Sequence, residues 1–418
     1  MRLFSLLLAT PLVLGAPVLE TEGKVVPGKW IVVMKEDYDM DAVSRRKRGV
    51  KAELEVESLA TPQHTYSLGS FKAYALDASD ALINQVAKIQ DVAYIEPDIM
   101  VETAATAFES NSPWGLARIS SRTRNSTTYT YDESAGEGTY TYIIDSGIYT
   151  DHPEFEGRAS WGASFVSGDE NPTVDENGHG THVAGIAGSK TYGVAKKTNL
   201  IAVKVLNAAG SGLISQVIAG IQWVVDDAKS KNQKEMLLTP ISGINKSIAN
   251  ISLGVVAIGN STVSLAAGAA VEEGLFIAAA AGNSQTPVEF FAPAQYPTLC
   301  SIAASAPDDS RARFSNYGNG VDLFAPGVDV VSTYNNGSTH VLSGTSMAAP
   351  HVAGLGAYLL TLEGDRDPIA LCARIQELAT KDIVTNANSP NNMLAFNGAD
   401  QTSLYRRRVL LRSLTSRS

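Results

Sequence analysis

The chain has 418 residues, of which 44% are hydrophobic, so it exceeds one ordinary domain and can bury a sizeable core. Its formal net charge is −10, and an acidic surface argues against nucleic acid as a partner. After the first sixteen residues no stretch is long and apolar enough to cross a bilayer, which argues against stable membrane insertion.

Residues 1–16 have the pattern of a signal peptide. Arg2 precedes the apolar run Leu3–Leu14, and the small residues Gly15 and Ala16 follow it. The run is too short for a membrane span and ends like a cleavage site. We therefore predict a secreted, extracellular protein from which this segment is removed.

A small α+β unit is predicted over residues 17–106. Lys29–Glu36 is typical of a strand and Ala81–Ile89 of an amphipathic helix, and the segment Ala93–Asp98 closes the unit. The following stretch, Glu102–Ser112, is small, polar and unpatterned, as expected of a cleavable linker. The alternative to a removable unit is a permanent accessory domain.

From residue 113 onward, predicted strands alternate with predicted helices. The apolar strands are Thr139–Asp145, Leu200–Leu206, Ala249–Leu253 and Leu275–Ala281, and the helices include Ile214–Lys229 and Val263–Gly274. Such alternation predicts an α/β fold, a doubly wound parallel sheet with helices on both faces.

Two polar side chains stand out in this region. Asp145 ends a strand, where open α/β sheets place their sites. His179 lies between glycines at the start of a small-residue helix, Asn177–Gly185. Their ordinary interpretations are a turn residue and a helix cap. His179 and His182 also have a spacing that zinc accepts, but no further ligand completes such a site.

A serine opens a later apolar helix. Ser346 lies in Gly344–Pro350, ahead of the run Ala349–Leu362. Free N–H groups at a helix N-terminus favour a developing anion, although an isolated serine there is more often an N-cap. A nucleophilic serine needs a base and a group that orients the base. His179 and Asp145 can supply both functions.

The order Asp145, His179, Ser346 is that of subtilisin, and the three motifs together resemble the subtilisin-like serine proteases, most closely the secreted fungal enzymes of the proteinase K subgroup. The resemblance implies a serine endopeptidase in which Ser346 attacks, His179 transfers the proton and Asp145 orients the histidine. It also implies that Asn283, at the end of a predicted strand, donates its amide to the oxyanion.

The same resemblance implies a domain organisation. Residues 17–106 would form an inhibitor-type propeptide with a ferredoxin-like fold, and residues 107–401 the catalytic domain, with a mature start near Ala107. The partners implied are protein and peptide substrates and the chain's own propeptide, which acts as an intramolecular inhibitor. The protein is expected to be a monomer.

Substrate-binding segments follow from the resemblance as well. A peptide strand would pair with Gly210-Ser211-Gly212 on one side and Ser252-Leu253-Gly254 on the other. The specificity pocket would lie between Ser252–Val255 and Ala280–Asn283, including Gly282, and neither segment carries a charge. An apolar or aromatic P1 residue (the residue before the cleaved bond) is therefore expected. Val255 departs from the family pattern, and a valine there would favour smaller side chains.

Calcium is the one cofactor implied, with a structural role and none in catalysis. Its ligands would be the carbonyls of Pro297 and Leu299 and the carboxylate of Asp322, a set that suits this cation.

The resemblance also pairs Cys300 with Cys372, the chain's two cysteines, the alternative being two buried thiols. Asn-x-Ser/Thr sequons predict glycosylation at Asn125, Asn245, Asn260 and Asn336, whereas Asn250 falls in a predicted buried strand.

Charge is unevenly distributed. Residues 107–401 carry 17 lysines and arginines against 28 aspartates and glutamates, whereas residues 402–418 carry five arginines and no acid. This basic tail is interpreted as disordered or trimmed, the alternative being a short amphipathic helix at an acidic surface or membrane.

Two other functions remain as alternatives. One is a catalytically silent binding protein with the same fold. The other, a lipase, is disfavoured because the Ser346 motif lacks the final glycine of G-x-S-x-G.

Overall fold

The computed structural model describes residues 15–19, 25–38, 62–103, 106–107, 113–169, 171–236, 246–259 and 261–399. They divide into two compact units, one containing Val26–Pro97 and the other Asp98 onward. The signal-peptide and basic-tail predictions lie outside the described residues, apart from Gly15 and Ala16. No helix among these ranges is long and apolar enough to span a membrane.

The first unit is a small α+β structure. Its strands are β1 (Val25–Met34), β2 (His64–Leu68), β3 (Phe71–Asp77) and the first part of β4 (Val92–Thr103), in the order β4-β1-β3-β2. The helix α3 (Asp80–Val86) begins at Ser79, whose hydroxyl accepts a hydrogen bond from the Leu82 amide. Ile83 and Val86 of this helix join the core of the unit.

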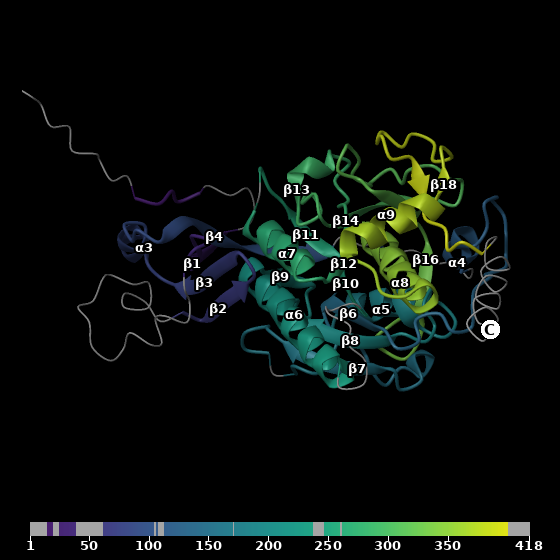
Figure 1. Cartoon of the computed structure of the whole chain (residues 1–418), viewed down its shortest axis with the longest axis horizontal. Helices are drawn as coiled ribbons and strands as arrows, with labels where there is room; N and C mark the ends of the chain where they lie inside the picture. Colours follow the sequence, from purple (N-terminus) through teal and green to yellow (C-terminus); the bar gives the residue numbers. More distant parts are fainter. Residues whose placement is uncertain are drawn as a thin grey trace, which may run out of the picture. The chain divides into compact units, whose positions relative to one another are not determined.

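A nine-stranded sheet organises the second unit, in the order β18-β19-β15-β14-β12-β10-β6-β8-β7 (Figure 1). From β19 to β7 the strands run parallel. Their bounds are β6 (Tyr140–Asp145), β7 (Ala159–Ser164), β8 (Asn199–Lys204), β10 (Ser247–Ile251), β12 (Phe276–Ala280), β14 (Cys300–Ser305), β15 (Leu323–Pro326), β18 (Thr380–Lys381) and β19 (Met393–Leu394). The central strands are buried along their length, as a sheet covered on both faces requires.

Helices pack in pairs against this sheet. α5 (His179–Gly188) packs with α8 (Thr345–Glu363), and α6 (Ile214–Met236) with α7 (Thr262–Glu272). α4 (Trp114–Ile119) and α9 (Pro368–Leu378) complete the set, with the short turns η1 (Pro153–Phe155) and η2 (Val288–Phe290). Small residues such as Gly354, whose added Cβ would lie 2.7 Å from Val194, allow α8 to approach its neighbours closely.

Short strands lie outside the main sheet and pair with one another or with β4. They are β5 (Thr106–Ala107), β9 (Ser211–Leu213), β11 (Leu253–Val256), β13 (Phe291–Ala292), β16 (Val330–Thr333) and β17 (Thr339–Ser343). The predicted doubly wound fold is therefore confirmed, and each predicted core strand is observed to within two residues at either end.

Candidate active site

An aspartate–histidine pair lies at the carboxyl edge of the central strands. Asp145 ends β6 and His179 begins α5, and the two side chains are 0% and 4% exposed. The Asp145 Oδ1 atom lies 2.8 Å from His179 Nδ1 and also accepts the Ser146 amide at 2.7 Å. A buried carboxylate on Nδ1 leaves Nε2 as the ring nitrogen that can accept a proton.

Ser346 lies in the first turn of α8 and is completely buried. Its hydroxyl donates to the Ser252 carbonyl at 3.0 Å, while the Ser252 hydroxyl donates to the Ser346 carbonyl at 2.9 Å. Among the described residues, His179 Nε2 is buried and has no hydrogen-bond partner. For the predicted proton transfer to His179, the Ser346 hydroxyl would first have to leave the Ser252 carbonyl, a rearrangement that catalytic hydrogen bonds often need.

The Asn283 side chain is oriented by the residue before the serine. Its Oδ1 atom accepts the Thr345 amide at 2.8 Å and the Thr345 hydroxyl at 2.9 Å. The Thr345 hydroxyl oxygen in turn accepts the Gly282 amide at 3.1 Å. Because the oxygen of Asn283 faces Thr345, the NH₂ group, which can only donate, is directed to the opposite side.

An antiparallel strand runs between the two predicted substrate-binding segments. Within the second unit, Val101 and Glu102 of β4 pair with Gly212 and Ser211 of β9, and Glu102 and Thr103 pair with Gly254 and Leu253 of β11. Gly210, with φ +74°, turns the chain into β9. The chain itself thus supplies the extended peptide that these segments are predicted to bind, in the manner of β-augmentation.

Phe291 lies between the two segments that frame the predicted specificity pocket. A Cβ added to Gly254 would lie 2.5 Å from Phe291 Cε1, and one added to Gly282 would lie 2.8 Å from Phe291 Cγ. Val255 pairs with Ala292, the residue that follows Phe291. Ala280 ends β12, two residues before Gly282. If the predicted pocket lies here, an aromatic ring against both glycines would limit the depth available to a substrate side chain.

Asp98 makes a contact that sequence reasoning did not single out. Its carboxylate accepts the Ser215 amide at 3.1 Å and also the Ser215 hydroxyl, and Asp98 is buried. Ser215 lies in the first turn of α6, so the carboxylate acts as a cap for that helix. The available signal was an acidic residue at the end of an apolar run, which is too common to identify a cap.

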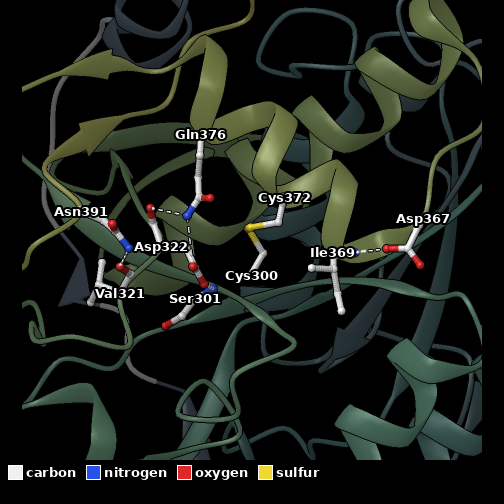
Figure 2. Close-up of a disulfide and its surroundings, with 9 residues drawn as sticks. All are labelled: Cys300, Ser301, Val321, Asp322, Asp367, Ile369, Cys372, Gln376 and Asn391. Carbon is white, nitrogen blue, oxygen red and sulfur yellow. Dashed lines mark hydrogen bonds between the residues drawn. A yellow bond between two sulfur atoms is a disulfide. The ribbon is translucent and has the colours of Figure 1, made fainter.

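The structure joins Cys300 of β14 to Cys372 of α9 by a disulfide (Figure 2). Beside it, Asp322 Oδ2 accepts the Ser301 amide at 2.9 Å and Oδ1 accepts Gln376 Nε2 at 3.1 Å. Burial raises the pKa of the Asp322 carboxyl to about 6. A cation would relieve this penalty on the ionised form, and Pro297 and Leu299 lie in the loop that leads into β14. The donor set therefore fits calcium in its chemistry.

The sequons differ in accessibility. Asn125 and Asn336 are exposed. Asn250 is fully buried and donates to the Ser252 hydroxyl at 2.8 Å, which agrees with the prediction against its modification. Asn245 and Asn260 lie outside the described residues.

Comparison with known proteins agrees with this geometry. The model of the subtilase family matches residues 136–398, and that of the peptidase inhibitor I9 family matches residues 29–104. A subtilisin-like serine protease, AsES, from Sarocladium strictum is 43% identical over 95% of this chain and 99% of its own length. A cuticle-degrading protease from Metarhizium anisopliae is 41% identical over 96% and 98%.

A solved structure of a cold-adapted subtilisin-like serine proteinase is also similar. It has a TM-score of 0.62 and 37% identity, and the match covers 69% of this chain and 99% of the other. The chain therefore belongs to the subtilase family, as a subtilisin-like serine endopeptidase preceded by an I9-type inhibitor propeptide.

Proposed function

We propose that the mature protein is a secreted, monomeric endopeptidase that cleaves proteins through Ser346, His179, Asp145 and Asn283. The observation that supports this most directly is the buried 2.8 Å contact between Asp145 and His179. The signal-peptide pattern of Met1–Ala16 supports secretion.

In the proposed mechanism, the Ser346 hydroxyl turns from the Ser252 carbonyl toward His179 Nε2 and attacks the substrate carbonyl. His179 accepts the hydroxyl proton and later donates it to the leaving amine. Asp145 holds the imidazole through Nδ1 and stabilises its charged form. The Ser346 amide and the Asn283 NH₂ group donate to the oxyanion, whose charge develops only in the transition state.

We also propose that the chain is a zymogen, with residues 17–106 as inhibitor and residues 107–401 as the catalytic domain. β4 occupies the substrate-binding segments as far as Thr103, and Thr106 and Ala107 pair with Ser343 and Leu342 of β17. Thr103 thus pairs with Leu253, which follows Ser252, and Thr106 pairs with Ser343, three residues before Ser346. This register supports cleavage between Thr103 and Ala107 and a mature start near Ala107.

The proposed substrate class is broad, because hydrogen bonds between the substrate backbone and β9 and β11 do not depend on the side chains of the substrate. At P1 we propose apolar residues. The position of Phe291 against Gly254 and Gly282 supports the smaller members of this class, in line with the expected effect of Val255.

A structural calcium ion is proposed at the carbonyls of Pro297 and Leu299 and the carboxylate of Asp322. It would supply charge compensation for a buried carboxylate next to the disulfide and would have no part in the chemical step. Asn125, Asn245, Asn260 and Asn336 remain the proposed glycosylation sites.

The deciding experiment compares the full-length wild-type chain with Ser346→Ala. We expect the wild type to mature to a chain that starts between Ala105 and Ala107, by mass and N-terminal sequence, and to cleave apolar-P1 peptide anilides. The alanine variant should remain intact and inactive. A wild type that folds but neither matures nor cleaves any peptide would instead favour the binding-protein alternative.

A further inference from the structure

Asp175 occupies an unusual place in the loop before α5. It lies four residues before His179, is 3% exposed, and its carboxylate is surrounded by donors. Its Oδ1 atom accepts the Asn177 amide at 3.2 Å, the Gly178 amide at 2.9 Å and the Ser146 hydroxyl at 2.9 Å. The Oδ2 atom accepts the amide of Thr181 at 2.9 Å and its hydroxyl at 2.5 Å.

These contacts complete the N-terminus of the helix that carries His179. The cap residue, Gly178, has no side chain to offer, yet four amides at this end need acceptors. Asp175 accepts two of them, from Gly178 and Thr181. The His179 amide donates to Asn177 Oδ1 at 3.2 Å, and the Gly180 amide to the Ser146 hydroxyl at 2.9 Å. The orientation of α5 therefore depends on Asp175 and Ser146 together.

Ser146 connects this network to the other catalytic element. It directly follows Asp145, donates its amide to the Asp145 carboxylate at 2.7 Å, and donates its hydroxyl to Asp175. Its carbonyl accepts Lys204 Nζ at 3.0 Å. Lys204 is 0% exposed, also donates to the Leu206 carbonyl at 3.0 Å, and lies 3.8 Å from Asp169 Oδ2. The turn after Asp145 is thus held between a buried ammonium and a buried carboxylate.

We propose that Asp175 is a positioning residue for the Asp145–His179 pair. Through Ser146 it fixes the end of β6, and through the amides of Gly178 and Thr181 it fixes the start of α5, so one carboxylate sets the relation between the two elements. The proposal rests on the proposed roles of Asp145 and His179. Catalytic groups require placement to a fraction of an ångström, and a misplacement of about 1 Å can cost about 100-fold in rate.

The simpler view is that Asp175 is only a helix cap. A cap would affect the stability of the fold and leave the chemistry of the folded enzyme unchanged. Asp309 offers a matched control because it is also a buried loop aspartate. It pairs with Arg118 at 2.7 Å and contacts none of the residues of the proposed triad through any described hydrogen bond or ion pair.

The experiment uses full-length chains with Asp175→Asn, Asp309→Asn or neither, each matured by a trace of wild-type enzyme where required. For folded Asp175→Asn we expect kcat on a peptide anilide to fall about 100-fold with KM within about threefold of wild type. Asp309→Asn should lower the melting temperature and keep kcat within about twofold. A kcat within twofold in folded Asp175→Asn, or an equal fall in Asp309→Asn, would overturn the proposal.

A second measurement does not depend on activity. In inactive Ser346→Ala precursors, we expect the low-field ¹H resonance of the His179 Nδ1 proton, bonded to Asp145, to shift or broaden with Asp175→Asn and to stay in place with Asp309→Asn. An unmoved resonance would contradict the proposal. If Asp175→Asn does not fold, Ser146→Ala decides. It removes the hydroxyl that donates to Asp175 and accepts the Gly180 amide, and it leaves the Asp175 carboxylate in place. We expect kcat to fall about tenfold, and an unchanged kcat refutes the coupling. A wild type without peptidase activity would refute the proposed function, while the resonance would still test this inference.

Discussion

Ser346 shares two hydrogen bonds with Ser252, one in each direction. The hydroxyl is directed to a carbonyl rather than to His179. Asn283, by contrast, is already oriented by Thr345 on both of its acceptor contacts. At the scale of single residues, the proposed oxyanion donor is therefore held in place by Thr345, whereas the proposed nucleophile has to turn away from Ser252 before it can contact His179.

The first prediction concerns Asn283. Replacing it with alanine removes a donor that acts on the oxyanion and not on the ground-state carbonyl, so kcat should fall about 10²–10³-fold, a range measured on subtilisin itself, with KM nearly unchanged. Steady-state kinetics on a peptide anilide measure this. The control is Asn336→Ala on an exposed turn, and an equal loss in that variant would remove the catalytic explanation.

A second prediction at this scale concerns Phe291. Phe291→Ala should open space between Gly254 and Gly282, and kcat/KM for phenylalanine at P1 should rise about 10–100-fold relative to alanine at P1, because each buried methylene in a pocket contributes about tenfold or more. Parallel assays on matched peptides give the ratio. A ratio that does not change would place the specificity determinant elsewhere, with Val255→Gly as the next variant.

At the scale of elements, contacts between segments far apart in the chain are made by short edge strands and by the N-terminal ends of helices. β9 and β11 have unpaired edges that accept β4 in the precursor, and the N-termini of α5 and α6 are completed by carboxylates that lie outside each helix, Asp175 and Asp98. The sequence predicts the helices and strands themselves from periodicity. It does not predict these partners. Asp98 caps a helix that begins more than a hundred residues later and so leaves no local pattern, and Asp175 lies before Gly178, the residue at the N-cap position itself.

The third prediction follows from the α6 cap. In the Ser346→Ala precursor, Asp98→Ala should lower the stability of the catalytic unit by about 1 kcal/mol, the usual contribution of an N-cap side chain. A mature enzyme that starts near Ala107, as proposed, lacks Asp98, so its melting temperature should be the same whichever precursor produced it. Calorimetry on both forms tests this. An equal melting temperature for the two precursors would show that another acceptor replaces the carboxylate.

Among the described residues, His182 and His351 are two histidines that the proposed mechanism does not use and that are almost completely buried. His182 donates from Nε2 to the carbonyls of Val330 and His340, each at 3.1 Å, and His351 donates from Nδ1 to the Met347 carbonyl at 2.8 Å. Burial lowers the pKa of His182 to about 3 and that of His351 to about 4. Both are therefore neutral in the folded protein at ordinary pH.

From these two pKa values we predict, as the fourth prediction, that the stability of the folded protein falls in acid. Their folded pKa values lie below 6.5, so their stabilising effect is complete above about pH 6.5 and is lost as the pH falls toward 4, by roughly 1.4 kcal/mol per pH unit for each histidine. In Ser346→Ala, the free energy of urea unfolding measured from pH 7 to pH 4.5 should show this slope. His351→Gln keeps a donor and removes one titration, so its slope should be smaller by about one proton. An identical slope would exclude His351 as a contributor.

The fifth prediction concerns the proposed calcium site. Chelation with EDTA should lower the melting temperature of the mature enzyme, and added calcium, but not magnesium, should restore it, because a carboxylate with backbone carbonyls suits the larger cation. Asp322→Asn removes the charge that the cation compensates and should make the melting temperature insensitive to EDTA. A wild-type melting temperature that does not change in EDTA would refute the proposed calcium site.

The sequence alone determined the alternating fold, because apolar strands and amphipathic helices carry their periods locally. It also determined the order of Asp145, His179 and Ser346, since each lies in a short motif at the end of a strand or the start of a helix. Tertiary structure alone decided that the Ser346 hydroxyl bonds to Ser252, that Phe291 lies against Gly254 and Gly282, and that Asp175 joins the two catalytic elements. Each of these depends on distances between segments that are far apart along the chain, and such distances are set by packing.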